Sequence, residues 1–278
     1  MEVQAPSRDH TSENFPVASW LLPKESRPHV MAFYRFARAA DDIADGTGGT
    51  DVEKCTRLDR MLAVLDGAEP ADGPEQAAAQ LVESLAQTGV TDQYARHVLQ
   101  AFRRDAENPR CRTWSDLMLY CRYSAAPVGR FLIDTTGEDA AAYPASDALC
   151  AALQVLNHLQ DCGDDRRRID RVYIPTDWLA AEGASVEDLE SDRASPALRK
   201  VLDRCLDGVD VLLAQATPLS GLLGHSRLRY DAAVIHAIAC RLRNRLRRGD
   251  PLAHRIALTK SERAVCLARG LLRGLRQR

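Results

Sequence analysis

Apolar residues recur at helical spacing along most of the 278-residue chain, and no segment alternates apolar and polar residues as a half-buried strand does. Aromatic residues make up only 5% of the chain, while Ala, Leu and Arg are abundant, a composition that favours helix over strand. The periodicity predicts helices over residues 27–46, 51–66, 74–89, 91–107, 113–136, 145–168, 194–215, 226–248 and 259–275.

None of the breaks between these helices is long enough to be a flexible linker between domains. Hydrophobic residues make up 45% of the chain, which is typical of a folded protein and excludes a disordered one. We therefore expect one all-α domain over residues 1–278, with residues 1–12 as a flexible N-terminus.

Charge is unevenly distributed along the chain, although the formal net charge is only −2. Residues 225–278 carry 14 Lys and Arg against 3 Asp and Glu, whereas residues 1–224 carry 23 against 36. This separation indicates an anionic ligand or an anionic surface, and the alternative is a solvated basic helix that offsets an acidic body.

Several classes of protein are excluded by what the sequence lacks. No apolar run approaches the roughly 18–20 residues that cross a bilayer, and the N-terminus has no apolar core like that of a signal peptide. The eight cysteines are scattered and form no C-x-x-C pair, as in a reduced cytosolic protein. We expect a cytoplasmic protein without a structural zinc site.

The first candidate site lies in the sequence RPHVMAFYRFARAADDIADG, expected to be one helix that begins near Pro28 and ends at Gly46. At 100° per residue, Asp41 and Asp45 share a face with apolar residues, and Asp42 lies at its edge. Their i,i+4 spacing lets two carboxylates converge on one hard cation. The alternative is a solvent-exposed acidic last turn, which would oppose the helix dipole.

The second candidate site repeats this pattern about 120 residues later. Asp161 and Asp165 are again four residues apart on one helical face, with Asn157 one turn earlier. Gly163 lies inside the same helix, where a glycine often leaves room for a close neighbour or a ligand. A surface helix with salt bridges is the alternative. Facing each other in a bundle, the two pairs would hold Mg²⁺ ions that bind a substrate diphosphate.

These residues carry a resemblance to the squalene/phytoene synthase family of isoprenoid enzymes, and it extends from about residue 13 to residue 260. The motifs that carry it are FYRFARAADDIAD (33–45), YCRYSAAPVG (120–129), LQVLNHLQDCGDDRRRIDRVYIP (153–175) and DPLAHRIALTK (250–260). The resemblance implies the all-α terpenoid-synthase fold, a helical bundle with a central prenyl cavity.

Within the family, the sequences ENFPVAS and LNHLQDC resemble the hydroxysqualene synthase branch of bacterial hopanoid biosynthesis. That branch implies conversion of presqualene diphosphate and water to hydroxysqualene and diphosphate, with Mg²⁺ and without NADPH. It would act between an enzyme that makes presqualene diphosphate and an oxidoreductase that makes squalene. Gln160 stands where synthases that join two prenyl diphosphates usually have Arg, which argues against condensation.

The alternatives are another prenyl synthase of the family, making presqualene diphosphate, squalene or phytoene, and a non-catalytic scaffold with the same fold. Scaffolds of this kind usually lose motif aspartates, and all four are intact here.

The resemblance also assigns roles to residues. It implies that Mg²⁺ is bound by Asp41, Asp42, Asp45, Asp161 and Asp165. It implies that the diphosphate is bound by Arg38, Arg255 and Lys260.

Water capture and the prenyl chain need further residues. The candidates for positioning water are Tyr120, Asn157 and Gln160. The candidates for the prenyl-cavity wall are Phe15, Phe33, Tyr34, Tyr123 and Phe131, whose aromatic faces would stabilise carbocations. For Phe33 and Phe131, plain core packing is the favoured interpretation.

The lipid substrate also suggests peripheral contact with the inner face of the membrane, for which the unassigned basic C-terminal residues are candidates. Nucleic acid is not an expected partner, because the arginines lie on an apolar helix without a reading motif.

Overall fold

The computed structural model describes residues 22–276, and in this range it contains helices and no strand. The helices are α1 (Arg27–Asp45), α2 (Asp51–Leu65), α3 (Pro74–Thr88), α4 (Gln93–Glu107), α5 (Trp114–Ser124), α6 (Ala126–Thr135), α7 (Tyr143–Ile169), α8 (Thr176–Ala181), α9 (Pro196–Ala216), α10 (Leu219–Leu222), α11 (Ser226–Arg248) and α12 (Lys260–Arg276), with short 3-10 helices at Ala140–Ala142 and Glu187–Glu190. The all-α prediction is confirmed. The expected flexible segment 1–12 lies outside the described residues.

One predicted helix was wrong. The segment 113–136 forms two helices, α5 and α6, which meet at Ala125. Pro127 lies in the first turn of α6, where its missing amide costs no helical hydrogen bond. The proline therefore begins a new helix instead of bending a continuous one. The short helices α8 and α10 also lie in segments that were expected to be irregular.

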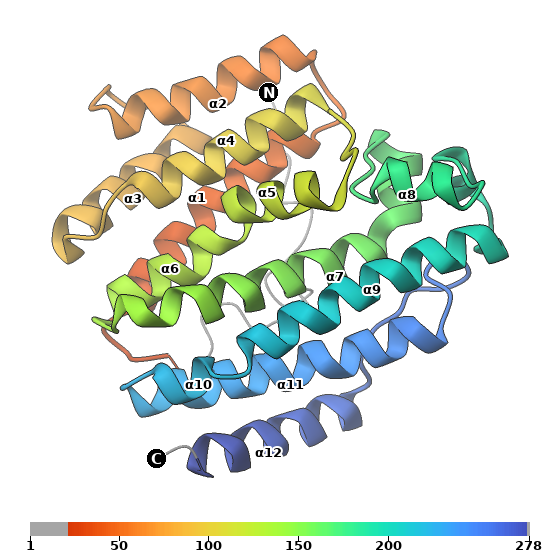
Figure 1. The fold of residues 1–278 in the computed structure, drawn as a ribbon. Helices are drawn as coiled ribbons and strands as arrows, with labels where there is room; N and C mark the ends of the chain where they lie inside the picture. The colour runs from red at the N-terminus through yellow and green to blue at the C-terminus, as the bar shows by residue number, and fades with distance from the viewer. Residues whose placement is uncertain (1–21, 277–278) are drawn as a thin grey trace.

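The helices pack around two hydrophobic clusters (Figure 1). One cluster joins α1, α2, α3 and α4, and it includes the buried side chains of Phe36 and Met61. The other cluster is built around α7, α9 and α11, which run side by side. Helices α5 and α6 lie between these groups, and both contact α7. Helix α12 packs on α11 at the edge of the molecule.

Local signals explain the two helices that carry the aspartates. Helix α1 has a proline in its first turn and ends before Gly46. Helix α7 also has a proline in its first turn, and it ends at Asp170, whose φ of 52° is left-handed. The last turn of α7 is basic, which suits the helix dipole, whereas the last turn of α1 holds aspartates that oppose it. The acidic end of α1 therefore requires a reason other than helix stability.

Candidate active site

Both aspartate pairs line one cavity of about 320 Å³ between α1, α5 and α7. Its wall comes from Tyr34, Ala37, Arg38, Asp41, Asp45, Phe102, Tyr120, Ser124, Val128, Gln154, Asn157, His158, Asp161, Asp165, Arg168, Ile169, Arg171 and Tyr173. The structure thus brings together four of the five predicted metal ligands, with the predicted Arg38, Tyr120, Asn157 and Tyr34. Their roles remain predictions, but their common location is the geometry that a diphosphate site requires.

The α1 side of the cavity concentrates negative charge. Arg38 pairs with Asp41 at 3.1 Å and with Asp42 at 2.9 Å, so this arginine already neutralises part of it. Burial raises the pKa of Asp41 to about 8, and the neighbouring Asp45 adds to the rise. Asp42 is not part of the cavity wall and contacts it through Arg38. A carboxylate held this way has an electrostatic preference for an added cation.

The α7 side presents its polar residues on one helical stripe, as predicted. Asn157, Asp161 and Asp165 line the cavity at successive turns, and Arg168 follows them. Gly163 lies elsewhere on α7, and a Cβ there would be 2.7 Å from Leu252 Cδ2 and 3.2 Å from the Leu189 carbonyl oxygen. The glycine makes room for neighbouring protein segments, not for a ligand.

Sequence reasoning missed a buried cation on the cavity wall. Arg171 is 7% exposed and forms an ion pair with Asp45. It also donates to the carbonyl oxygens of Ala44 at 3.3 Å and Asp105 at 2.9 Å. Arg171 joins the end of α1 to α4 and to the segment after α7. Its place in the motif RVYIP was the available signal.

Asp105 is a second residue that the sequence did not single out, and it accepts hydrogen bonds from two tyrosines near Arg171. Tyr120 donates to Asp105 at 2.6 Å and Tyr173 donates to it at 3.0 Å, and the two hydroxyl oxygens are 3.2 Å apart. Burial raises the pKa of Asp105 to about 6, and Arg171 partly offsets this effect. His158 stacks on Tyr173 with ring centroids 3.6 Å apart. No pattern in the sequence distinguished Asp105 from other helical acidic residues.

The donors of this cavity fit Mg²⁺ if substrate phosphates complete its coordination. Among residues 22–276, no three His, Cys, Asp or Glu side chains lie close enough to form a metal cage. Mg²⁺ commonly binds through one or two carboxylates together with substrate phosphates. Carboxylates on two facing walls, with Arg38 and Arg171 against one of them, match that second arrangement.

Three predicted polar residues lie outside the cavity wall. Gln160 is buried, and its amide donates to the carbonyl oxygen of Ile256. Arg255 is exposed within the loop that leads into α12, and Lys260 is exposed at the first residue of that helix. Gln160 therefore holds the segment that carries Arg255, and its side chain does not point to the site as predicted.

The predicted aromatic residues divide into different environments. Phe33 and Phe131 are buried and stack on each other with centroids 4.4 Å apart, as core residues do. Tyr123 makes an edge-on contact with His97 at 5.0 Å and is not part of the cavity wall. Tyr34 lines the cavity. Phe15 lies outside the described residues.

Comparison with known proteins agrees with this geometry. Residues 8–262 match the squalene/phytoene synthase family, and the chain belongs to this family. A hydroxysqualene synthase from Rhodopseudomonas palustris is 44% identical over 92% of this chain and 86% of the relative. One from Sinorhizobium fredii is 42% identical over 91% of this chain and 86% of the relative. The protein is therefore an enzyme of this family.

The fold is also found among solved structures. The crystal structure of a squalene synthase from Alicyclobacillus acidocaldarius has a TM-score of 0.72 and 30% sequence identity, covering 86% of this chain and 90% of that one. The helical bundle described above is therefore a squalene/phytoene synthase fold.

Proposed function

We propose that the protein is a hydroxysqualene synthase that converts presqualene diphosphate and water to hydroxysqualene and diphosphate with the aid of Mg²⁺. The observation that carries the proposal is the single cavity in which aspartate pairs of α1 and α7 face each other. Relatives named for this activity, at 44% and 42% identity over most of the chain, support the choice of reaction.

The polar end of the cavity has the charges that a leaving diphosphate needs. When bound, Mg²⁺ would neutralise the charge that develops on the departing diphosphate. Asp41, Asp45, Asp161 and Asp165 are the residues that would hold it. Arg38 of α1 and Arg168 of α7 line the same cavity and would donate to diphosphate oxygens, as arginine does to phosphate groups elsewhere.

The other part of the cavity suits a hydrocarbon. Ala37, Phe102, Val128 and Ile169 contribute apolar surface to its wall, and Tyr34 adds an aromatic ring. Loss of diphosphate from presqualene diphosphate leaves a carbocation, and aromatic faces stabilise cations. These side chains would bind the prenyl chains and keep bulk water away from the cation.

Water capture requires a polar group at the apolar wall. Tyr120 and Asn157 both line the cavity, and the hydroxyl of Tyr120 is oriented by Asp105 at 2.6 Å. These two residues are the candidates for holding the water that attacks the cation. Gln160 is not a candidate, because its amide is bound to the Ile256 carbonyl. Gln160 stands where condensing synthases usually have Arg, but its side chain does not line the cavity and so does not act there directly. The preference for hydroxysqualene formation over condensation of two prenyl diphosphates therefore rests on the relatives.

The reaction needs no reductant, since addition of water to the carbocation makes an alcohol without net change of oxidation state. NADPH is therefore not expected as a cofactor. The chemistry places the enzyme after one that supplies a cyclopropyl prenyl diphosphate and before one that reduces an allylic alcohol.

Product analysis tests the proposal. Purified protein given presqualene diphosphate and Mg²⁺ without NADPH should release hydroxysqualene and diphosphate, and chelation of the metal should stop it. Asp41→Asn and Asp161→Asn should each lower the rate by about 100-fold or more, because each removes a charge from the metal site. Asp72→Asn, at an exposed position between α2 and α3, is the matched control.

Other products would support other members of the family. Phytoene from geranylgeranyl diphosphate, or presqualene diphosphate from farnesyl diphosphate alone, would contradict the proposal. Equal cellular function of the wild type and the two aspartate variants would favour a non-catalytic scaffold.

A further inference from the structure

Helix α12 lies at the edge of the molecule and packs on α11 through glycines. A Cβ on Gly270 would be 2.6 Å from the Val234 Cα, and one on Gly274 would be 2.4 Å from Tyr230 Cδ1. Only glycine permits this close approach. The two glycines fix which face of α12 is buried, so the opposite face is held toward solvent.

That outward face is apolar. Val265, Leu272 and Leu275 are 49%, 57% and 50% exposed. At 100° per residue they fall within about 80° of one another, so they form one stripe. The outer face of a surface helix is normally polar. A stripe of exposed aliphatic side chains on the outermost helix therefore indicates an interaction surface.

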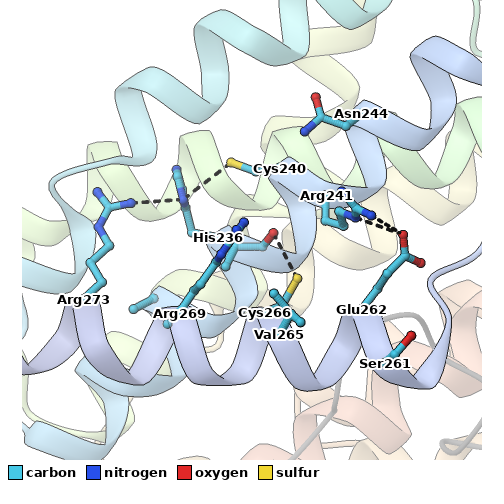
Figure 2. Close-up of a pocket in the computed structure, with 13 residues that line it drawn as sticks. His236, Cys240, Arg241, Asn244, Ser261, Glu262, Val265, Cys266, Arg269 and Arg273 are labelled. Carbon is cyan, nitrogen blue, oxygen red and sulfur yellow. Dashed lines mark hydrogen bonds and ion pairs between the residues drawn. The ribbon is translucent and has the colours of Figure 1, made fainter.

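Basic side chains border the stripe on one side. A cleft of about 510 Å³ runs between α11 and α12, and Figure 2 shows Arg241, Arg269 and Arg273 around it with His236. Arg273 donates to the Thr217 carbonyl oxygen at 3.0 Å.

Among the described residues that line this cleft, the one carboxylate, Glu262, is already paired. Glu262 binds Arg241 at 2.7 Å and Arg245 at 2.8 Å. Arg269 is exposed and has no ion pair within residues 22–276. The cleft is therefore a basic surface beside an apolar one, with Val265 belonging to both.

We propose that this outer face of α12, formed by Val265, Leu272 and Leu275 with the bordering Arg269, docks on an anionic lipid surface. Aliphatic side chains beside arginines match the layered chemistry of a bilayer, with acyl chains beneath phosphate groups. A second copy of this chain is a poorer occupant, because its own basic face would be repelled. Nucleic acid would match the arginines and leave the leucines exposed.

The contact would be peripheral. Within the described part of the chain, no helix has the length and apolar character needed to span a bilayer. The docking face draws only on α11 and α12, so it does not depend on the reaction proposed for the cavity. A failed product assay would leave it standing.

Vesicle co-sedimentation tests the docking face. The wild-type protein should bind vesicles that contain phosphatidylglycerol, bind vesicles of phosphatidylcholine alone far more weakly, and be released by salt. Leu272→Ser combined with Leu275→Ser should weaken binding by about tenfold or more. Arg269→Gln should weaken it by about fivefold.

Matched controls change equally exposed residues elsewhere. Val211→Ser on α9 and Arg57→Gln on α2 should bind as the wild type does. Circular dichroism identifies any variant that has lost helix. Hydrogen exchange of the wild type provides a test without mutation, since vesicles should slow exchange in α12 more than in α2.

Three results would overturn the proposal. They are absence of binding to anionic vesicles, equal binding by the leucine variant and the wild type, and unchanged exchange in α12. A concentration-dependent dimer that the leucine substitutions abolish would assign the face to a second copy instead.

Discussion

Replacement of Gln160 distinguishes a structural role, as a hydrogen-bond donor to the loop before α12, from the predicted role in positioning water. In the structure Gln160 is 5% exposed, and its amide donates to the Ile256 carbonyl oxygen in the loop that precedes α12. Gln160→Leu has similar volume but cannot donate, so the buried carbonyl loses this partner. Such a loss costs about 1–3 kcal/mol.

The consequence for stability can be measured directly. For a chain of this size, about 1–3 kcal/mol corresponds to a fall in Tm of roughly 2–5 °C. Urea denaturation and thermal melting of Gln160→Leu should both show it. Gln100→Leu, on an exposed position of α4, is the matched control and should stay within about 0.5 kcal/mol of the wild type.

The same variant has a specific consequence for catalysis. Gln160 holds the segment that carries Arg255, so KM for presqualene diphosphate is expected to rise if Arg255 reaches the diphosphate. The product should remain hydroxysqualene, since Gln160 does not line the cavity. An unchanged Tm would refute the assigned hydrogen bond. A change of product would refute the reasoning that removes Gln160 from water capture.

Three further substitutions test the packing of the core, the packing of α12 and the protonation of a buried histidine. Phe33→Ala should lower the free energy of unfolding by about 3–5 kcal/mol with little change in KM of the remaining folded enzyme, and a large KM effect with normal stability would restore its predicted place in the prenyl wall. Gly270→Ala should cost about 1–3 kcal/mol by urea denaturation because its Cβ meets the Val234 backbone, whereas Ala268→Ser on the exposed side should not. Burial lowers the pKa of His158 from 6.5 to about 3, so the unfolded chain binds its proton first as pH falls. The wild-type free energy of unfolding should therefore decline between pH 6.5 and about 3 more steeply than that of His158→Phe, by roughly one proton, and parallel declines would contradict this.

The helices and the two acidic stripes followed from the sequence because both are local. Helical periodicity places Asp41 over Asp45 and Asp161 over Asp165 whatever the helices pack against. Pro127 suits the first turn of a helix, but whether it occupies one depended on where Ala125 interrupts the segment 113–136. The all-α class could thus be predicted, and the division into α5 and α6 could not.

Partners from different helices required the tertiary structure. Whether Arg171 reaches Asp45, and whether Asp105 accepts from two tyrosines, depends on the rotation and spacing of packed helices, which no single segment encodes. The orientation of the Gln160 side chain could not be predicted for the same reason, because its acceptor lies in a loop 96 residues away in the chain.

The basic C-terminal region shows this division most clearly. Its charge was evident from composition alone, and it indicated an anionic partner. The structure divides that charge between internal ion pairs, such as Arg245 with Glu262, and outward residues such as Arg269 beside exposed leucines. Composition counts charges, whereas packing decides which of them remain available to a partner, because burial and pairing depend on neighbours that are distant in the chain.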